Sequence, residues 1–127
     1  MLSDIPIEVT KTLPWPPSIN MCYRSHAGKI IRSKEGREFA EKCKEIFKDD
    51  ECLYQDKEEL FCMIELYPPS NHRRDVDNYG KVVIDQIPWF EDDSQIKALL
   101  ILMMPKDEKK DGFAQVSLGK FEDGNSI

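Results

Sequence analysis

Two long apolar runs limit most strongly what this chain can fold into. Residues 60–67 (LFCMIELY) have the length of a strand and end at Pro68-Pro69. Residues 95–104 (QIKALLILMM) end at Pro105, and their place after a turn favours a strand, although Ala, Leu and Met also tolerate helix. Apolar strands bury their surface against helices or a second sheet, so the runs predict a layered domain.

The rest of the pattern supplies further strands and two helices. Strands are predicted at residues 5–13, 29–32 and 113–118, and helices at about 34–48 and 75–86. Ser33 is a plausible N-cap for the first helix, and Pro88 ends the second. The predicted fold class is α+β: one small domain over residues 1–127, a mixed sheet of about four or five strands with two helices packed on it, and a frayed tail at 122–127.

Each predicted helix has an apolar stripe at helical spacing, which we interpret as core. The stripe of the first helix is Phe39, Ala40, Cys43, Ile46 and Phe47. The stripe of the second helix is Val76, Tyr79, Val83 and Ile87. The four cysteines, Cys22, Cys43, Cys52 and Cys62, lack zinc spacing and are expected to be reduced and mostly buried.

The composition limits the location and the partners. No apolar run is long enough to span a membrane, and the N-terminus lacks the features of a signal peptide, so we expect a cytoplasmic protein with no membrane partner. The net charge of −6 argues against a nucleic-acid partner, but the charge is uneven. Acid concentrates at 48–59 and 106–111, whereas base concentrates at 24–44 and at Arg73-Arg74.

The most informative segment places acidic and basic residues at the start of the second predicted helix. Asp75 and Asp77 are two apart, so on an extended lead-in their carboxylates point the same way. Two converging carboxylates repel unless a cation lies between them, and magnesium prefers such oxygen ligands. Lys81 follows one helical turn later, where it would stabilise charge, and Arg73-Arg74 would contact phosphate. A second acidic cluster, Glu91-Asp92-Asp93, precedes the strand predicted at 95–104.

Ordinary structural roles also account for these residues. An Asp near a helix start caps it, an Asp–Lys pair at i,i+4 is routine, and an acidic loop is often only solvated. On a continuous helix, Asp85 would lie about 12 Å along the axis from Asp77, too far to share an ion with it. His26 and His72 match no motif and are expected at the surface.

The sequence resembles the RusA family of Holliday junction resolvases from bacteria and their phages. The family's Asp-x-Asp-Asn-x-x-Lys-x-x-x-Asp motif stands here at residues 75–85, preceded by Arg73-Arg74. Its Asp-Asp-x-Gln motif stands at residues 92–95. An earlier motif, Leu-Pro-Trp-Pro-Pro-Ser-x-Asn followed by Tyr and Arg, stands at 13–20 and at Tyr23-Arg24. The resemblance covers most of residues 13–96.

The resemblance implies a magnesium-dependent endodeoxyribonuclease, with manganese as a substitute, that acts in DNA recombination and repair. It implies a homodimer that binds four-way DNA junctions by shape and nicks two strands symmetrically. Carried over by position, the metal-binding catalytic residues would be Asp75, Asp77 and Asp93, with Asp92 the weaker candidate of its pair. Lys81 would be catalytic, and the DNA-binding residues would be Arg73, Arg74, Lys81 and Arg24.

One departure from the family leaves alternatives open. The loop over residues 86–91 is shorter than usual for the family, which would shift whether Asp92 or Asp93 faces the metal. The alternatives are therefore a catalytically silent protein that binds branched DNA, and an acidic interaction protein with no DNA role. The stiff Pro14-Trp15-Pro16-Pro17 segment, with Ile19, is expected either at the dimer interface or as a strut beside the site.

Overall fold

A four-stranded mixed sheet organises the computed structural model, which describes residues 7–121. The strands are β1 (Val9–Pro14), β2 (Tyr23–His26), β3 (Lys29–Arg32), β4 (Leu60–Tyr67), β5 (Ile96–Met103) and β6 (Phe113–Lys120). The helices are α1 (Ile19–Cys22), α2 (Lys34–Ile46) and α3 (Gly80–Ile84), and short 3-10 turns occur at η2 (Val76–Asn78) and η3 (Asp93–Gln95). The predicted α+β class is confirmed.

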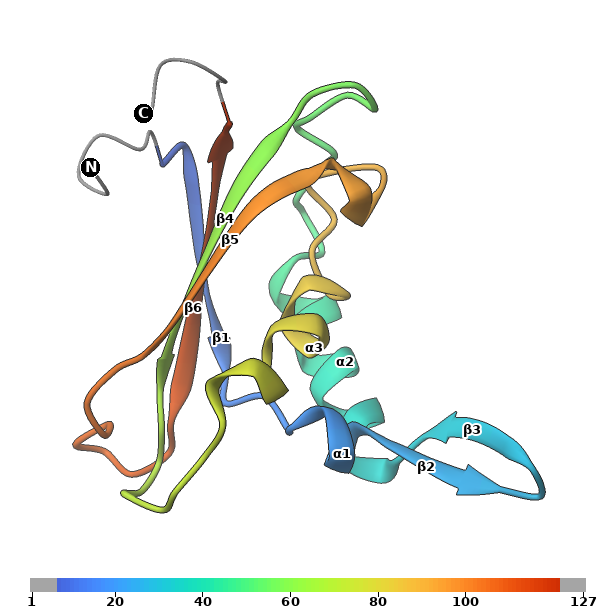
Figure 1. Cartoon of the computed structure of the whole chain (residues 1–127), viewed down its shortest axis with the longest axis vertical. Helices are drawn as coiled ribbons and strands as arrows, with labels where there is room; N and C mark the ends of the chain where they lie inside the picture. The colour runs from blue at the N-terminus through green and yellow to red at the C-terminus, as the bar shows by residue number, and fades with distance from the viewer. Residues whose placement is uncertain (1–6, 122–127) are drawn as a thin grey trace.

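The order of strands in the main sheet is β1-β6-β4-β5. β6 is antiparallel to both β1 and β4, whereas β5 is parallel to β4. Alternate β4 side chains, Leu60, Cys62, Ile64 and Leu66, are fully buried. Figure 1 shows the helices together on one side of this sheet. A parallel pair needs a crossover connection, and here the crossover between β4 and β5 contains the predicted acidic site.

The first predicted helix is confirmed as α2. Ser33 adopts an extended backbone, and its hydroxyl accepts a hydrogen bond from the Gly36 amide, as an N-cap does. Phe39, Cys43 and Phe47 are buried in the core. The helical spacing of apolar residues therefore identified the face that packs on the sheet.

The second predicted helix is wrong as one continuous element. The chain forms η2, breaks at Tyr79, and then forms the short helix α3. Val76 is 38% exposed and does not belong to the buried stripe, whereas Tyr79, Val83 and Ile87 do. Gly80, a poor helix former, lies against β5, where an added Cβ would come 2.6 Å from Ile101. Close packing on the sheet, rather than helical periodicity, sets the backbone here.

A two-stranded hairpin was only half predicted. The strand expected at 29–32 is β3, and it pairs antiparallel with β2, which the sequence pattern did not indicate. The connecting residues, Ala27 and Gly28, have φ angles of 51° and 77°. Two consecutive residues with positive φ are typical of a tight type I′ hairpin turn. In Figure 1 this hairpin projects from the helical side of the molecule.

Other predictions agree with the structure where it describes them. The first strand begins at Val9, and residues 5–6 and the predicted tail at 122–127 lie outside the described residues. Cys22, Cys43 and Cys62 are buried free thiols, whereas Cys52 is exposed. His26 and His72 are at the surface. Within residues 7–121, no helix is both long and apolar enough to cross a bilayer.

Candidate active site

Arg74 braces the segment that leads into the acidic motif. Its guanidinium donates to the Ser70 carbonyl at 2.9 Å, to the Ser70 hydroxyl at 2.9 Å and to the His72 carbonyl at 3.1 Å. The same guanidinium lies 5.5 Å from the centre of the Trp15 ring. Trp15 in turn packs on Tyr79, with ring centres 5.1 Å apart. The Pro-rich segment is thus a strut beside the site, one of the two roles expected of it.

An open pocket of about 440 Å³ lies beside this brace. It is lined by Ser18, Arg73, Arg74, Asp75, Asn78 and Tyr79. Arginine and carboxylate side chains therefore face the same space. An arginine fork matches a phosphate group, and a carboxylate beside it binds a cation or accepts a proton. The sequence placed these residues next to one another, and the fold leaves them around one opening.

The carboxylates of Asp75 and Asp77 are exposed to solvent. Asp75 occupies the position before η2 with an extended backbone, yet its side chain makes no capping hydrogen bond. The turn is closed instead by the backbone, with the Asn78 amide donating to the Asp75 carbonyl at 3.1 Å. Helix capping therefore does not account for Asp75. The break at Tyr79 also separates Asp77 from α3, and the expected pairing of Asp77 with Lys81 is not among the ion pairs of the described residues.

Lys81 joins the crossover helix to the second acidic cluster. Its ammonium lies 2.8 Å from Asp85 Oδ1 and 2.9 Å from Asp93 Oδ2. Its hydrogen bond to Asp85, and to a smaller extent its hydrogen bond to Asp93, raise the pKa of Lys81 above its ordinary value. The side chain is 59% exposed, so the pair is open to solvent and to a substrate. The fold thus brings together Lys81 and Asp93, two of the predicted site residues.

Asp92 and Asp93 have different roles. The Asp92 carboxylate caps η3 by accepting from the Ser94 amide at 2.9 Å, and these contacts with Ser94 lower the pKa of Asp92. Gln95 completes the capping box by accepting from the backbone amides of Glu91 and Asp92. With Asp92 used as the cap, Asp93 is the carboxylate directed at Lys81. The metal-binding role expected of Asp93 stays a prediction.

The short loop over residues 86–91 is anchored by Trp89. The side chain is 1% exposed, and its indole N–H donates to Asp50 Oδ2 at 2.9 Å. The Trp89 ring also meets Phe47 edge to face, with centres 5.4 Å apart. Anchoring to the core fixes where the loop delivers η3, so its shortness does not prevent the contact between Asp93 and Lys81.

The structure does not gather every predicted site residue. Within residues 7–121, no three side chains of Asp, Glu, His or Cys are arranged to hold one metal ion. Arg24 lies on the hairpin rather than at the pocket. The donor chemistry nevertheless fits magnesium, because Asp75, Asp77 and Asp93 offer only carboxylate oxygens and are all exposed.

Sequence reasoning did not find every contact that supports the site. Asp85 was expected to lie too far from Asp77 to share an ion with it, and its ammonium–carboxylate contact with Lys81, four residues earlier, measures 2.8 Å. Their spacing of four was the available signal. Gln95 is 4% exposed and donates to the carbonyls of Gln55 and Glu58, at 2.6 and 3.1 Å. No local pattern predicts those bonds, because the partners lie about forty residues away.

Comparisons with known proteins match most of this chain. The family model described as endodeoxyribonuclease RusA matches residues 14–113. The chain is 32% identical over 97 residues to the crossover junction endodeoxyribonuclease RusA of Escherichia coli, covering 74% of this chain and 81% of that protein. The protein of the same name from Enterobacteria phage 82 matches at the same identity and coverage. The match spans the Pro-rich strut, the arginine pocket and both acidic segments, and the chain belongs to the RusA endodeoxyribonuclease family.

Proposed function

We propose that this chain is a crossover junction endodeoxyribonuclease that hydrolyses DNA phosphodiesters at four-way junctions, in recombination and repair. The observation that carries the proposal is the pocket in which Arg73 and Arg74 adjoin Asp75. This combination of charges suits cleavage of a phosphodiester, because the arginine cations bind the phosphate and the carboxylate binds a cation or accepts a proton. The names and family of the relatives support junction DNA as the substrate.

Each residue has a distinct task in this proposal. Arg73 binds a phosphate oxygen, while Arg74, held by Trp15 and the Ser70 carbonyl, keeps the pocket wall in place. Lys81 offsets the charge that grows on the phosphate during cleavage. Asp75, Asp77 and Asp93 would hold magnesium, for which manganese can substitute. When bound, that ion supplies a Lewis acid and lowers the pKa of water.

A homodimer is part of the same proposal, because two symmetric nicks call for two copies of one site. The sheet offers a surface for it. In β5, the half-buried Leu100 and Leu102 pair with Met63 and Glu65 of β4, on the sheet face opposite Cys62, Ile64 and Leu66. The described helices all lie across the other face (Figure 1). We expect sedimentation to give a dimer, and Leu102→Glu to shift it toward monomer.

The test of the proposed reaction is cleavage of a synthetic four-way junction with magnesium. We expect paired nicks at symmetric positions, and no comparable cutting of a linear duplex with the same sequence. Asp75→Asn should abolish the nicks. The matched control is Asp111→Asn, an exposed carboxylate in the turn between β5 and β6. Binding without nicks in magnesium or manganese would refute the enzyme assignment.

One observation favours a second candidate function, a catalytically silent protein that binds branched DNA. The Asp93 carboxylate is bonded to the Lys81 ammonium, and no three-residue metal cluster is formed within the described chain. Titration with manganese separates the candidates. A nuclease should show site-specific binding that Asp75→Asn weakens, whereas a silent protein should show none.

A further inference from the structure

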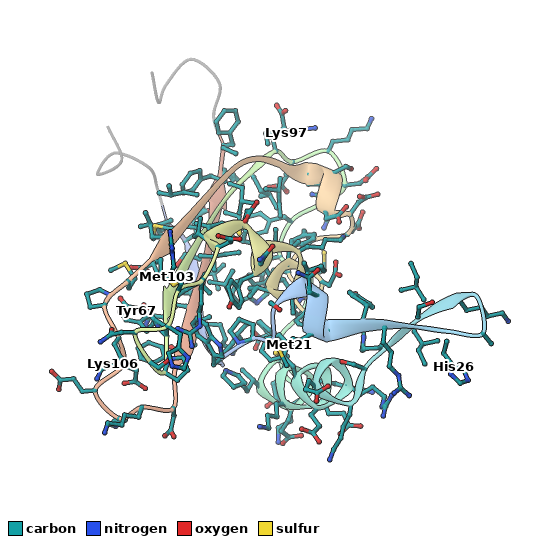
Figure 2. The ribbon with its side chains drawn as sticks, turned by 60° about the horizontal axis from the view of Figure 1, so that its bottom comes forward. Met21, His26, Tyr67, Lys97, Met103 and Lys106 are labelled. Atoms are coloured by element: carbon teal, nitrogen blue, oxygen red, sulfur yellow. The ribbon has the colours of Figure 1, made fainter. Side chains whose placement is uncertain are left out.

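The β2–β3 hairpin is basic in an otherwise acidic chain. Residues 19–34 include Arg24, Lys29, Arg32 and Lys34 and no Asp or Glu, although the whole chain has a net charge of −6. Arg24, His26 and Lys29 are exposed, and Ile30 is 80% exposed. Figure 2 shows His26 at the far end of the hairpin, away from the body of the molecule. The hairpin thus holds a local positive charge in a position that a large partner can reach.

The basic side chains are not spread evenly over the hairpin. In its register Arg24 pairs with Ile31, and His26 pairs with Lys29. These two rungs alternate with the others, so Arg24, His26 and Lys29 share one face. Arg32 pairs with Tyr23 and lies on the opposite face with Ile30. One face therefore presents three nitrogen-bearing side chains to a partner.

The base of the hairpin is held tightly. The Ser33 hydroxyl donates to the carbonyls of Met21 and Cys22, and the Ser33 amide donates to the Cys22 carbonyl at 2.8 Å. Gly36 packs so closely that an added Cβ would clash with the Cys22 carbonyl. The base of the hairpin is therefore fixed to the body of the molecule, and its tip is a tight two-residue turn. An ordered arm loses little conformational entropy when it binds a rigid partner.

We propose that this hairpin is a DNA-binding arm, whose Arg24–His26–Lys29 face contacts the phosphate backbone of a duplex arm of the junction. The inference rests on the proposed function and extends the DNA contact beyond the pocket. α1 connects the two regions, since Ser18 lines the arginine pocket and caps α1, and β2 begins directly after α1. Four residues of strand extend about 13 Å, close to four base-pair steps of duplex.

Salt dependence of junction binding tests the arm. The variant combines Arg24→Gln with Lys29→Gln, and each substitution retains the methylene groups next to the backbone. Binding is measured in the Asp75→Asn background so that the DNA stays intact. We expect the slope of log affinity against log salt to become shallower by about two units, since each phosphate contact contributes about 0.9. At low salt the affinity should fall at least tenfold.

Two controls make the result specific. Lys106→Gln with Lys109→Gln removes the same charge from the turn before β6, which Figure 2 shows at the other side of the molecule from His26. Arg32→Gln removes a cation from the opposite face of the hairpin. The Lys106 and Lys109 variant should leave the slope unchanged, and Arg32→Gln should change it by well under the 0.9 units of one phosphate contact. Thermal unfolding at an unchanged midpoint confirms that the arm variant is folded.

Three results would overturn the inference. The slope could stay the same in the arm variant, or the Lys106 and Lys109 variant could change it equally. The arm variant could instead lose self-association while keeping its slope, which would make the hairpin a contact between protein copies. In each case the unaltered protein would still bind and cut junctions. If the unaltered protein does neither, the proposed function itself fails.

Discussion

The two acidic segments of the site are built in opposite ways. In the lead-in, Asp75 and Asp77 expose their carboxylates, and the backbone and Arg74 hold the chain. In the second segment, the side chains of Asp92 and Gln95 form hydrogen bonds to backbone groups, some local and some distant in sequence. Only the Asp93 carboxylate points outward, to Lys81. The lead-in therefore leaves its carboxylates facing solvent, whereas the second segment uses most of its polar side chains to position a single carboxylate.

The largest effect should come from removing a carboxylate of the lead-in. Asp77→Asn should reduce junction cleavage about a hundred- to a thousandfold, as loss of a group that acts on transition-state charge does. Junction affinity should hold or rise, because a negative charge near phosphate is removed. Single-turnover cleavage and binding are measured side by side. If Asp77→Asn cuts as well as Asp111→Asn, Asp77 has no catalytic role.

The next prediction compares how much each acidic segment contributes to the free energy of unfolding. Gln95→Ala removes the buried bonds to Gln55 and Glu58 and the acceptor for two amides, so we expect a loss of roughly 2–3 kcal/mol in the free energy of unfolding. Asn78→Ala in the lead-in should cost less than about 1 kcal/mol. Urea unfolding measures both. Equal losses would contradict the contrast between the two segments.

A smaller effect concerns Asp85 as the partner of Lys81. Asp85→Asn should reduce cleavage about tenfold, because Lys81 loses its shorter bond and its orientation. The pKa of Lys81 in the folded protein lies above the ordinary 10.5. The ammonium therefore keeps its charge, and its contribution to cleavage, below pH 10.5, and both are lost as pH rises through the folded pKa. Asp85→Asn lowers that pKa, so the alkaline decline of cleavage should begin at lower pH. An unchanged pH profile would show that Asp85 does not act through Lys81.

The smallest effect should come from the strut. Trp15→Ala removes the aromatic support of Arg74, an interaction worth about 0.5–1 kcal/mol, so junction affinity should fall about two- to fivefold. Trp15→Phe should restore most of that affinity, since it keeps a ring under the guanidinium. Leu53→Ala, at an exposed apolar residue remote in sequence, serves as the control. Equal affinities of Trp15→Ala and Trp15→Phe would exclude the stacking role.

Sequence patterns predicted the parts of the molecule that depend on local preference. The apolar run of β4 and the Ser33 cap of α2 follow from residues next to one another, and both were found. The continuous helix predicted from Asp75 is interrupted at Tyr79, next to Gly80, where Ile101 of β5 approaches so closely that a side chain would not fit. Ile101 is distant in sequence, so no local pattern marks this contact. Strand β2 was missed because its residues are polar and exposed, so no buried alternation marked it.

In the candidate site, too, the features set by neighbouring residues could be predicted, whereas those set by distant contacts could not. The positions of Asp75, Asp77, Lys81 and Asp93 could be read from motifs. The contact between Lys81 and Asp93 depends on how the crossover packs, and the Gln95 bonds depend on a segment that no motif marks.

The pairing of β1 with β6 also determines when this nuclease can become active during its synthesis. Val9 pairs with Leu118, so the first strand has no sheet partner until more than a hundred further residues have been made. β4 likewise waits for β5, and the acidic crossover lies between them. Such distant pairings form slowly and late in folding. A nascent chain on the ribosome therefore has its site residues long before it has the sheet that orders them, and DNA cleavage must await nearly the whole chain.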